Sequence, residues 1–430
     1  MIGLLELEVS WRWKHIHGKI DLSMGNRANH LLPTKLYAPP HRKVFVPRTN
    51  LLKQLNRGLE RKLTLISAPA GYGKSTLLSE FVRQSGVPAA WLSLDKGDND
   101  PSRFWSYFVA ALQTIPGLDH AWNANIFQNI QQKSFVSENE PLLTALITKI
   151  TAMSERVILI LDDLQTITED QILDGLFYLL ENLHPGPQGM HIIIASRSDP
   201  PWPLARLRAG DQITEIRSKD LSFTLDETTT FINGVMGLSL SPGEITELDQ
   251  RTEGWIAGLQ MAAISMQDRE NISEFLDAFT GSHRFVLDYL VEEVLNKQKP
   301  EIMNFLLKTS ILERMTSSLC NAITGICNAA DVLSHLEKAN LFLIALDEQR
   351  IWYRYHHLFA DLLHKQLRLK FPEQIPEIHR LASQWHAQNG SPIEAVEHAL
   401  KSNDREFAAT QVEEFILALI QNGEMRLARQ

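Results

Sequence analysis

The sequence predicts an α/β fold followed by helical domains, and three observations support this prediction. Up to about residue 217, short apolar runs alternate with amphipathic helical segments, which is typical of a parallel sheet with crossover helices. One apolar run, residues 63–66, leads directly into a glycine-containing loop and a helical segment. Beyond residue 217 the pattern is helical almost throughout, except for an alternating stretch at residues 341–355.

The expected parallel sheet consists of short strands joined by helices. Its plainest strand is the unbroken apolar run at residues 157–161, which is typical of a strand buried on both faces. Strands are expected at residues 63–66, 89–94, 157–161, 191–195 and 213–216, and helices at residues 49–59, 103–115, 142–153 and 172–183. Ligands of such sheets bind at the carboxyl ends of the strands, where the polar clusters of this sequence also lie.

The loop after the first expected strand has the pattern of a phosphate-binding loop (P-loop). Gly73, Lys74 and Ser75 match the end of G-x-x-x-x-G-K-S/T, and Ala68 stands where the first glycine usually lies. In such a loop backbone amides surround a phosphate, the lysine reaches the outer phosphates, and the hydroxyl binds Mg²⁺. The expected cofactors are therefore ATP or ADP with Mg²⁺, and the alternative is a structural glycine turn. The expected nucleotide-binding residues of the loop are Ala68, Pro69, Ala70, Gly71, Tyr72, Gly73, Lys74, Ser75 and Thr76.

Polar residues also follow the third and fourth expected strands. Asp162 and Asp163 have the place of a Walker B pair, in which the first carboxylate holds Mg²⁺ through water and the second orients or deprotonates the attacking water. With Lys74 they are the expected catalytic residues, and Ser75 and Asp162 are the expected metal ligands. Two solvated acids at a strand end are the alternative. Arg197 has the chemistry to sense a γ-phosphate, and a surface arginine is an equally good interpretation.

The helical part of the chain contains one expected β-hairpin. Its first helix is expected to begin with a capping box at residues 224–227. Residues 341–346 and 351–355 predict the hairpin, with a four-residue loop between them. Three helices followed by one hairpin predict a winged-helix domain. His356, directly after the hairpin, is a candidate contact for a β-phosphate, and a packed histidine is the alternative.

The hydrophobic and charged fractions are typical of a globular protein, and the low cysteine content is typical of a reducing compartment. The chain has 430 residues and a formal net charge of −9, which excludes binding of polyanions through overall charge. Cys320 and Cys327 have no partners at zinc-site spacing, so we expect two small core residues. We also expect core positions for four tryptophans, Trp91, Trp105, Trp255 and Trp385. The sequence has no run of about eighteen apolar residues, and residues 1–22 lack the order of a signal peptide. We therefore expect a cytoplasmic protein without membrane contact.

These patterns divide the chain into five expected regions. They are a disordered or mis-started extension at residues 1–30, a P-loop NTPase nucleotide-binding domain at 31–217, a helical domain at 218–290, a winged-helix domain at 291–370, and the start of helical (TPR-like) repeats at 371–430. A helical-repeat array needs about three or more repeats for stability. The expected fold class is thus α/β plus α, built around the P-loop NTPase sheet.

A series of short motifs resembles one known family. In chain order they are Val46-Pro47-Arg48, the loop from Ala68 to Thr76, Trp91-Leu92-Ser93-Leu94-Asp95, Asp162-Asp163, Ser196-Arg197-Ser198-Asp199-Pro200, Arg251-Thr252-Glu253-Gly254-Trp255, Gly281-Ser282-His283-Arg284 and Tyr355-His356. This series resembles the large ATP-binding LuxR-type transcriptional regulators, which are MalT-like signal-transduction ATPases of the STAND class. The resemblance covers about residues 30–430.

The resemblance implies a nucleotide-gated switch. ADP would hold a closed monomer, and ATP together with an unknown inducer would open it and promote self-association. Arg197 would be the sensor arginine, and His356 would contact the β-phosphate. Arg48 and the Gly254–Trp255 turn would lie near the base of the bound nucleotide. DNA would be bound only through a C-terminal helix-turn-helix domain, which the chain does not reach before Gln430. The chain would then be a fragment, a truncated gene product or a stand-alone switch core, with at most slow ATP hydrolysis.

The sequence shows one departure from this family and leaves two rival functions open. The aspartate pair is followed by Leu164-Gln165, where the family commonly has an aromatic residue and a histidine. A kinase or motor that couples ATP to other work is the first rival, although no acceptor site or aromatic channel is recognisable. DNA binding through the winged helix is the second. Its hairpin has only Arg350 and Arg354 as cations, with two acids at the tip, whereas phosphate contacts need clustered cations.

Overall fold

The computed structural model describes most of the chain. The described residues are 31–40, 45–115, 139–151, 155–184, 189–267, 272–281 and 283–421. They fall into two units, Met1–Thr34 and Lys35–Gln430, and every element discussed below lies in the second unit. The expected extension at residues 1–30 and residues 116–138 lie outside the described residues. No helix in the described ranges is long and apolar enough to cross a membrane.

The predicted parallel sheet is present and has five strands. They are β1 (Leu63–Ser67), β2 (Ala89–Ser93), β3 (Arg156–Asp162), β4 (Gly189–Ser196) and β5 (Ile213–Arg217), in the spatial order β2-β3-β4-β1-β5. Every neighbouring pair is parallel. β1 and β4 are buried along their whole length and β3 along all but its first residue, which explains the unbroken apolar run at residues 157–161.

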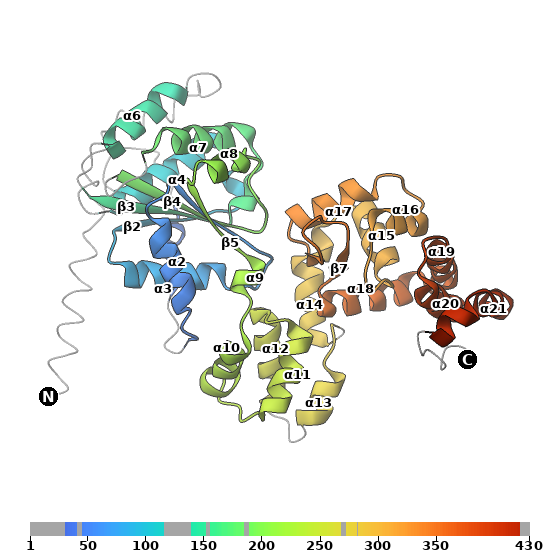
Figure 1. Ribbon diagram of the computed structural model, residues 1–430. Coiled ribbons are helices and arrows are strands. Elements are labelled where there is room, and N and C mark those ends of the chain that lie inside the picture. Colours follow the sequence, from blue (N-terminus) through green and yellow to red (C-terminus); the bar gives the residue numbers. More distant parts are fainter. Residues whose placement is uncertain are drawn as a thin grey trace. The chain divides into compact units, whose positions relative to one another are not determined.

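Helices cover both faces of this sheet (Figure 1). One face carries α2 (Thr49–Gly58) and α3 (Lys74–Ser85), and the other carries α4 (Pro101–Gln113), α6 (Asn139–Thr151) and α7 (Asp170–Asn182). The helical spacing of α2 is reproduced in three dimensions, because Leu51, Leu52 and Leu55 are among its buried side chains. The sheet with its two helical layers confirms the predicted α/β class.

A mostly helical stretch follows β5. It consists of α9 (Ser218–Leu221), α10 (Leu225–Thr229), a π-helical turn (Thr230–Val235), α11 (Pro242–Thr252), α12 (Ile256–Met266), α13 (Ile272–Ala278) and α14 (Arg284–Glu293). The short helix α8 (Leu204–Ala209) lies before this stretch, between β4 and β5. The capping box predicted at the start of α10 is present, with Thr224 and Glu227 each bonded to the other's backbone amide.

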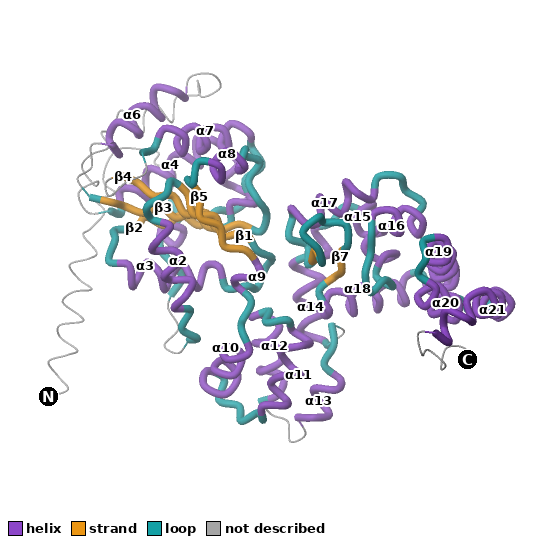
Figure 2. Tube along the Cα trace, viewed as in Figure 1, coloured by secondary structure: helices purple, strands orange, loops and turns teal. Residues whose placement is uncertain are grey.

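The hairpin predicted inside the helical part is present but shorter than expected (Figure 2). After α15 (Pro300–Thr309), α16 (Ser317–Thr324) and α17 (Ala329–Lys338), the strands are β6 (Leu343–Ala345) and β7 (Tyr353–Tyr355). The loop is longer than the four residues expected, because the Asp347 carboxylate accepts the amides of Ile351 and Trp352 and holds them out of the ladder. The helices α18 (His357–Lys370), α19 (Ile375–Gln388), α20 (Pro392–Lys401) and α21 (Arg405–Gln421) follow.

Two expectations about single residues need correction. Cys320 is buried as expected, and burial raises the pKa of its thiol to about 12, whereas Cys327 is exposed. Cys327 lies in the turn between α16 and α17, so its chain position gives it no place in the core. Trp91, Trp105 and Trp255 are buried core residues, but Trp385 is only partly buried.

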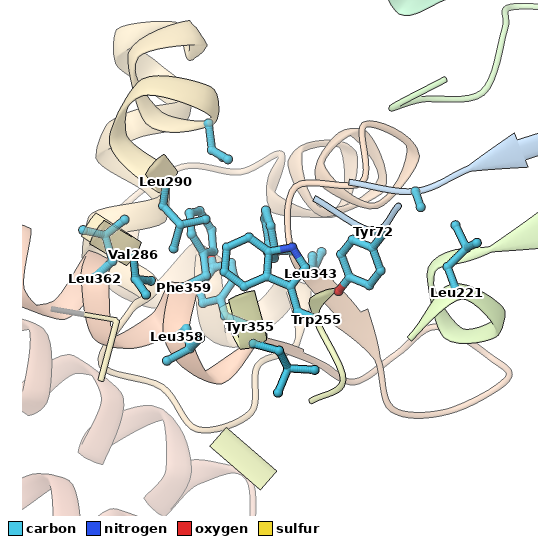
Figure 3. Packing of buried hydrophobic residues seen from close by; sticks show 14 of the residues in the cluster. Tyr72, Leu221, Trp255, Val286, Leu290, Leu343, Tyr355, Leu358, Phe359 and Leu362 are labelled. Atoms are coloured by element: carbon cyan, nitrogen blue, oxygen red, sulfur yellow. The ribbon is translucent and has the colours of Figure 1, made fainter. Parts of the chain in front are cut away.

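One continuous hydrophobic cluster connects the sheet to the helical part. It contains Leu55 of α2, Ile66 of β1, Trp255 before α12 and Phe359 of α18. Figure 3 shows the middle of this cluster, where Trp255, Tyr355 and Phe359 gather and Tyr72 of the phosphate loop lies on one side. The loop therefore lies at the boundary between the sheet and the helical elements.

Candidate nucleotide site

Strand register brings three polar segments to one edge of the sheet. In the ladder, Ser67 of β1 is paired with Ser196 of β4, and Asp162 of β3 is paired with Ala195 of β4. The segments that follow these strands therefore begin side by side at the carboxyl edge, as expected for a ligand site in a parallel sheet. They contain the phosphate loop, the aspartate pair and Arg197.

The phosphate loop is shaped by two glycines and closed by its own lysine. Gly71 and Gly73 have φ angles of +81° and +75°, a region that other residues enter at a cost. The Lys74 ammonium donates to the carbonyl oxygens of Ala68 (2.7 Å) and Pro69 (2.9 Å). Burial lowers the pKa of Lys74 to about 8, while Asp163 and Asp162 oppose this shift. The lysine is thus a buried cation held by neutral carbonyls, an arrangement suited to a phosphate.

Asp162 and Ser75 fit a Mg²⁺ ion. Their side chains are hydrogen-bonded to each other, and Asp162 Oδ1 is buried without a hydrogen-bond partner. Burial and then the neighbouring Asp163 raise the pKa of Asp162 to about 6. A carboxylate and a hydroxyl oxygen are ligands that Mg²⁺ prefers, and the ion usually completes its octahedron with water and phosphate oxygens. The buried, unpartnered oxygen is the kind of acceptor that a cation would satisfy.

Asp163 is held in a special backbone conformation, and its side chain is bonded to Gln165. Its φ is 62°, in the left-handed region, and it precedes the short 3-10 turn Leu164–Thr166. The Gln165 amide Nε2 donates to Asp163 Oδ1 at 2.8 Å, and Gln165 Oε1 accepts the backbone N–H of Arg197 at 2.8 Å. In the sequence Gln165 stands out only as a departure from the family pattern, and its position between Asp163 and Arg197 is visible only in the fold.

The side chain of Arg197 is bound to α14. Its Nη1 lies 2.7 Å from Glu293 Oε2, and Glu293 also pairs with Lys297 at 2.8 Å. The hydrogen bond from Lys297 makes the largest contribution to the lowered pKa of Glu293, and the Arg197 guanidinium adds to it. The predicted sensor arginine is therefore neutralised by a helix that lies about a hundred residues further along the chain.

The start of α12 packs directly onto the phosphate loop. The Trp255 indole Nε1 donates to the carbonyl of Ala70 at 3.0 Å, and the backbone N–H of Ala257 donates to the carbonyl of Gly71 at 3.0 Å. The approach is so close that a Cβ atom added to Gly71 would lie 2.5 Å from Ala257 Cβ. The sequence predicted Trp255 as a core residue, and the resemblance placed it near the base. Nothing in the sequence indicated that its indole would donate a hydrogen bond to the carbonyl of Ala70, which is 185 residues away.

Elements of the predicted winged-helix domain also reach the edge of the sheet beside the phosphate loop. Asn340, in the turn after α17, donates to Ser67 Oγ (3.0 Å) and to the carbonyl of Arg197 (2.9 Å). Phe342 lies with its ring centroid 6.4 Å from that of Tyr72 and 5.3 Å from that of Trp255. Nothing in the sequence pointed to Asn340, because its partners are 273 and 143 residues away.

His356 is buried beside Trp255, with ring centroids 5.9 Å apart. Its Nε2 is bonded to the carbonyl of Thr252 at 2.9 Å, and its Nδ1 is buried without a hydrogen-bond partner. Burial lowers the pKa of His356, although the nearby Glu253 opposes this shift. The ring is therefore uncharged at neutral pH, with its hydrogen on Nε2 and a lone pair on Nδ1. This state is that of a packed histidine, and a contact to a phosphate would require a second proton, on Nδ1.

Arg48 is engaged with the segment that leads from β5 into α10. Its guanidinium donates to the carbonyl oxygens of Leu221 (2.8 Å) and Asp220 (3.0 Å), and its Nε lies 3.1 Å from Glu227 Oε1. A cavity of about 250 Å³ borders this cluster and is lined by Arg48 and Glu227 among others. These bonds of Arg48 hold the lead-in segment to the helical part, and they do not include the loop from Ala68 to Thr76.

Comparisons with known proteins give related chains. Residues 291–375 match a family model described as the MalT winged helix domain. The HTH-type transcriptional regulator MalT of Klebsiella pneumoniae is 34% identical over 379 residues, which are 87% of this chain and 41% of that protein. MalT of Cronobacter sakazakii is 32% identical over 405 residues, which are 93% of this chain and 44% of that protein.

A protein with a different name shares the same region. The serine/threonine-protein kinase PknK of Mycobacterium tuberculosis is 33% identical over 374 residues, which are 86% of this chain and 33% of that protein. The chain thus spans between a third and less than half of the length of these curated relatives. Among solved structures, the Walker-type ATPase paby2304 of Pyrococcus abyssi aligns with a TM-score of 0.52 at 17% identity, covering 75% of this chain and 97% of that chain, which supports the fold.

Proposed function

We propose that the chain is the nucleotide-gated switch module of a MalT-like regulator, which the winged-helix match, the MalT relatives and the P-loop ATPase fold support. ATP or ADP with Mg²⁺ occupies the loop from Ala68 to Thr76. ADP favours the closed arrangement of the sheet, α12 and the winged helix, and ATP with an inducer favours an open form that self-associates. Hydrolysis is slow and resets the switch.

The observation that carries this proposal is the convergence of distant segments on one loop. The segment around Trp255 bonds to the carbonyls of Ala70 and Gly71, while Asn340 bonds to Ser67 at the start of the loop. Any change in loop conformation when a phosphate binds must alter the contacts of both the segment around Trp255 and the segment around Asn340, because these bonds are direct. An enzyme selected for rapid turnover has no need to bury its phosphate loop under two further domains.

The residues at the sheet edge have complementary parts in nucleotide binding. Mg²⁺, when bound, neutralises phosphate charge, and Ser75 and Asp162 are the residues that would hold it. Lys74 would exchange its carbonyl partners for phosphate oxygens, a stronger charge-assisted hydrogen bond. His356 would contact the β-phosphate through its unpartnered Nδ1 only after this nitrogen gains a proton, because Nε2 already donates to the Thr252 carbonyl, and a nearby phosphate charge would favour that second proton.

The relatives favour a regulatory module over an enzyme with its own substrate. The same region occurs in proteins whose names describe different activities, a transcriptional regulator and a protein kinase. A segment shared by such different proteins is more readily explained by a common control function than by a common reaction. Self-association and the inducer-dependent step belong to this proposal, as does a location in the cytoplasm.

Nucleotide binding through Lys74 is the first test. We expect Lys74→Ala to weaken ADP and ATP binding by about a hundredfold or more, since the variant leaves the phosphates without their buried cation, and calorimetric titration measures this. Lys62→Ala is the matched control, because Lys62 also donates to a carbonyl, that of Glu181, but from the other end of β1. Equal nucleotide affinity in wild type and Lys74→Ala would contradict the proposal.

A further inference from the structure

Gln165 connects the aspartate pair to the segment that carries Arg197. Its Nε2 donates to Asp163 Oδ1 and its Oε1 accepts the Arg197 N–H, both at 2.8 Å. The direction of the amide is fixed by chemistry, since a backbone N–H can only donate and must face the carbonyl oxygen. The amide nitrogen must then face Asp163. A glutamine turned the other way would place its NH2 group against the Arg197 N–H, donor against donor, and its oxygen against the Asp163 carboxylate, acceptor against acceptor.

The turn that carries Gln165 is fastened at its far end as well. Asn99 Oδ1 accepts the backbone N–H groups of Thr168 (2.7 Å) and Glu169 (3.1 Å), and Asn99 Nδ2 donates to the carbonyl of Thr166 (2.8 Å). The backbone of this turn therefore has supports of its own. Gln165 adds the link that fixes the side chain of Asp163.

We propose that Gln165 is a positioning residue for ATP hydrolysis, which holds the Asp163 carboxylate in place and ties it to Arg197. The proposal rests on the nucleotide switch proposed above. With Oδ1 occupied by Gln165, Asp163 presents Oδ2 to the attacking water. Asp163 accepts the proton of this water as its oxygen bonds to the γ-phosphorus, while the bond to the β–γ bridging oxygen breaks and ADP leaves with that electron pair.

The link to Arg197 gives Gln165 a second consequence. The carbonyl of Arg197 accepts Asn340 Nδ2 at 2.9 Å, and the Arg197 side chain pairs with Glu293. A continuous chain of contacts thus runs from the Asp163 carboxylate through Gln165 and Arg197 to the winged-helix side. The geometry of the hydrolytic carboxylate is therefore coupled to whether the winged-helix elements are docked.

The test compares three substitutions of Gln165. Gln165→Ala is expected to lower kcat for ATP hydrolysis by about tenfold or more while the ATP dissociation constant changes less than about twofold, because the carboxylate is misplaced and no phosphate contact is lost. Gln165→Glu cannot donate to Asp163 and is expected to lower kcat at least as much. Gln165→His restores hydrolysis above about pH 7, because a neutral imidazole has one donor and one acceptor. Below about pH 6 its activity falls relative to wild type as the ring gains a proton.

A second readout uses the nucleotide-free protein. Amide hydrogen exchange at Arg197 is expected to be about five to ten times faster in Gln165→Ala, the change typical of one lost hydrogen bond. Gln298→Ala is the matched control, since Gln298 also donates an amide hydrogen bond, to the Val294 carbonyl at 2.9 Å. It should leave kcat and the Arg197 amide unchanged.

The outcomes separate this inference from the switch proposal. A wild-type protein that binds no nucleotide would overturn both. A wild-type protein that binds ATP but keeps the same kcat in Gln165→Ala would overturn only the role of Gln165. A parallel loss of ATP affinity and kcat would do the same, because it would indicate a collapsed site instead of a misplaced carboxylate.

Discussion

Asp162 is a carboxyl group in an unfavourable place when no cation is bound. It is almost completely buried, one of its oxygens lacks a partner, and its pKa is raised to about 6. A carboxyl whose pKa is higher in the folded than in the unfolded protein binds protons more tightly when folded. Stability therefore falls as pH rises from about 4 to 6, and the full loss persists at neutral pH.

Removing this charge should stabilise the nucleotide-free protein. We expect Asp162→Asn to raise the melting temperature at pH 7.5 by several degrees, because a pKa raised from 3.8 to about 6 corresponds to about 3 kcal/mol. At pH 5 the difference should shrink, since the native carboxyl is then largely protonated. Differential scanning calorimetry without magnesium measures both values.

The same substitution should abolish the Mg²⁺ dependence of nucleotide binding. Asp174→Asn, which removes an exposed carboxylate from α7, is the control and should change neither property. A melting temperature that falls in Asp162→Asn at pH 7.5 would show that the buried carboxylate is already compensated by a partner.

At the scale of elements, the packing of α12 on the phosphate loop depends on a glycine. Gly71 has a left-handed φ of +81°, and an added Cβ would lie 2.5 Å from Ala257 Cβ and 2.7 Å from the Trp255 indole nitrogen. Two independent constraints thus act on one residue. One is local backbone strain, and the other is the close approach of a segment almost two hundred residues away.

Gly86 allows these two constraints to be separated. It also has a left-handed φ, of +67°, but an added Cβ would meet nothing within 4 Å. We expect Gly86→Ala to cost about 1–2 kcal/mol from backbone strain alone. Gly71→Ala should cost clearly more and should release α12, which thermal unfolding and amide exchange of residues 256–266 would detect. Equal losses in the two variants would show that α12 adapts to the added methyl group.

For the whole molecule, the pair between Arg197 and Glu293 is the contact most directly linked to switching. It joins the sheet edge to α14, and both side chains are about one-third exposed, so the pair contributes at most about 1 kcal/mol. The guanidinium that resemblance assigns to γ-phosphate sensing is thereby neutralised in this arrangement. An incoming γ-phosphate would compete with Glu293 for it.

Loss of the Glu293 charge should therefore favour the open form. We expect Glu293→Gln to raise the self-associated fraction in ATP about two- to fivefold, which corresponds to the free energy of such a pair, with little change in ADP. Sedimentation velocity in each nucleotide measures this fraction. Glu292→Gln, a substitution of the exposed neighbouring carboxylate, is the control. Identical association in wild type and Glu293→Gln would exclude this pair as a restraint.

Much of the sheet and of its ligand edge could be predicted from the sequence. The apolar run before Asp162 and the glycine loop before Ser75 are local patterns, and parallel strands bring their carboxyl ends together wherever they lie in the chain. The hairpin was predicted at the right place but with too short a loop, because the turn formed by the Asp347 carboxylate depends on side-chain bonds that periodicity does not reveal. Gln165 could be identified only as a departure from a family pattern.

The sequence by itself determined the order of the elements, the parallel α/β class and the position of the phosphate loop. These follow from periodicity and from glycine, lysine and serine at fixed spacing, which act over a few residues. Only the tertiary structure decided that Trp255, Asn340 and Glu293 meet the residues of that edge. Such contacts join segments that are far apart in the chain, and they depend on how whole helices pack, so no local pattern encodes them.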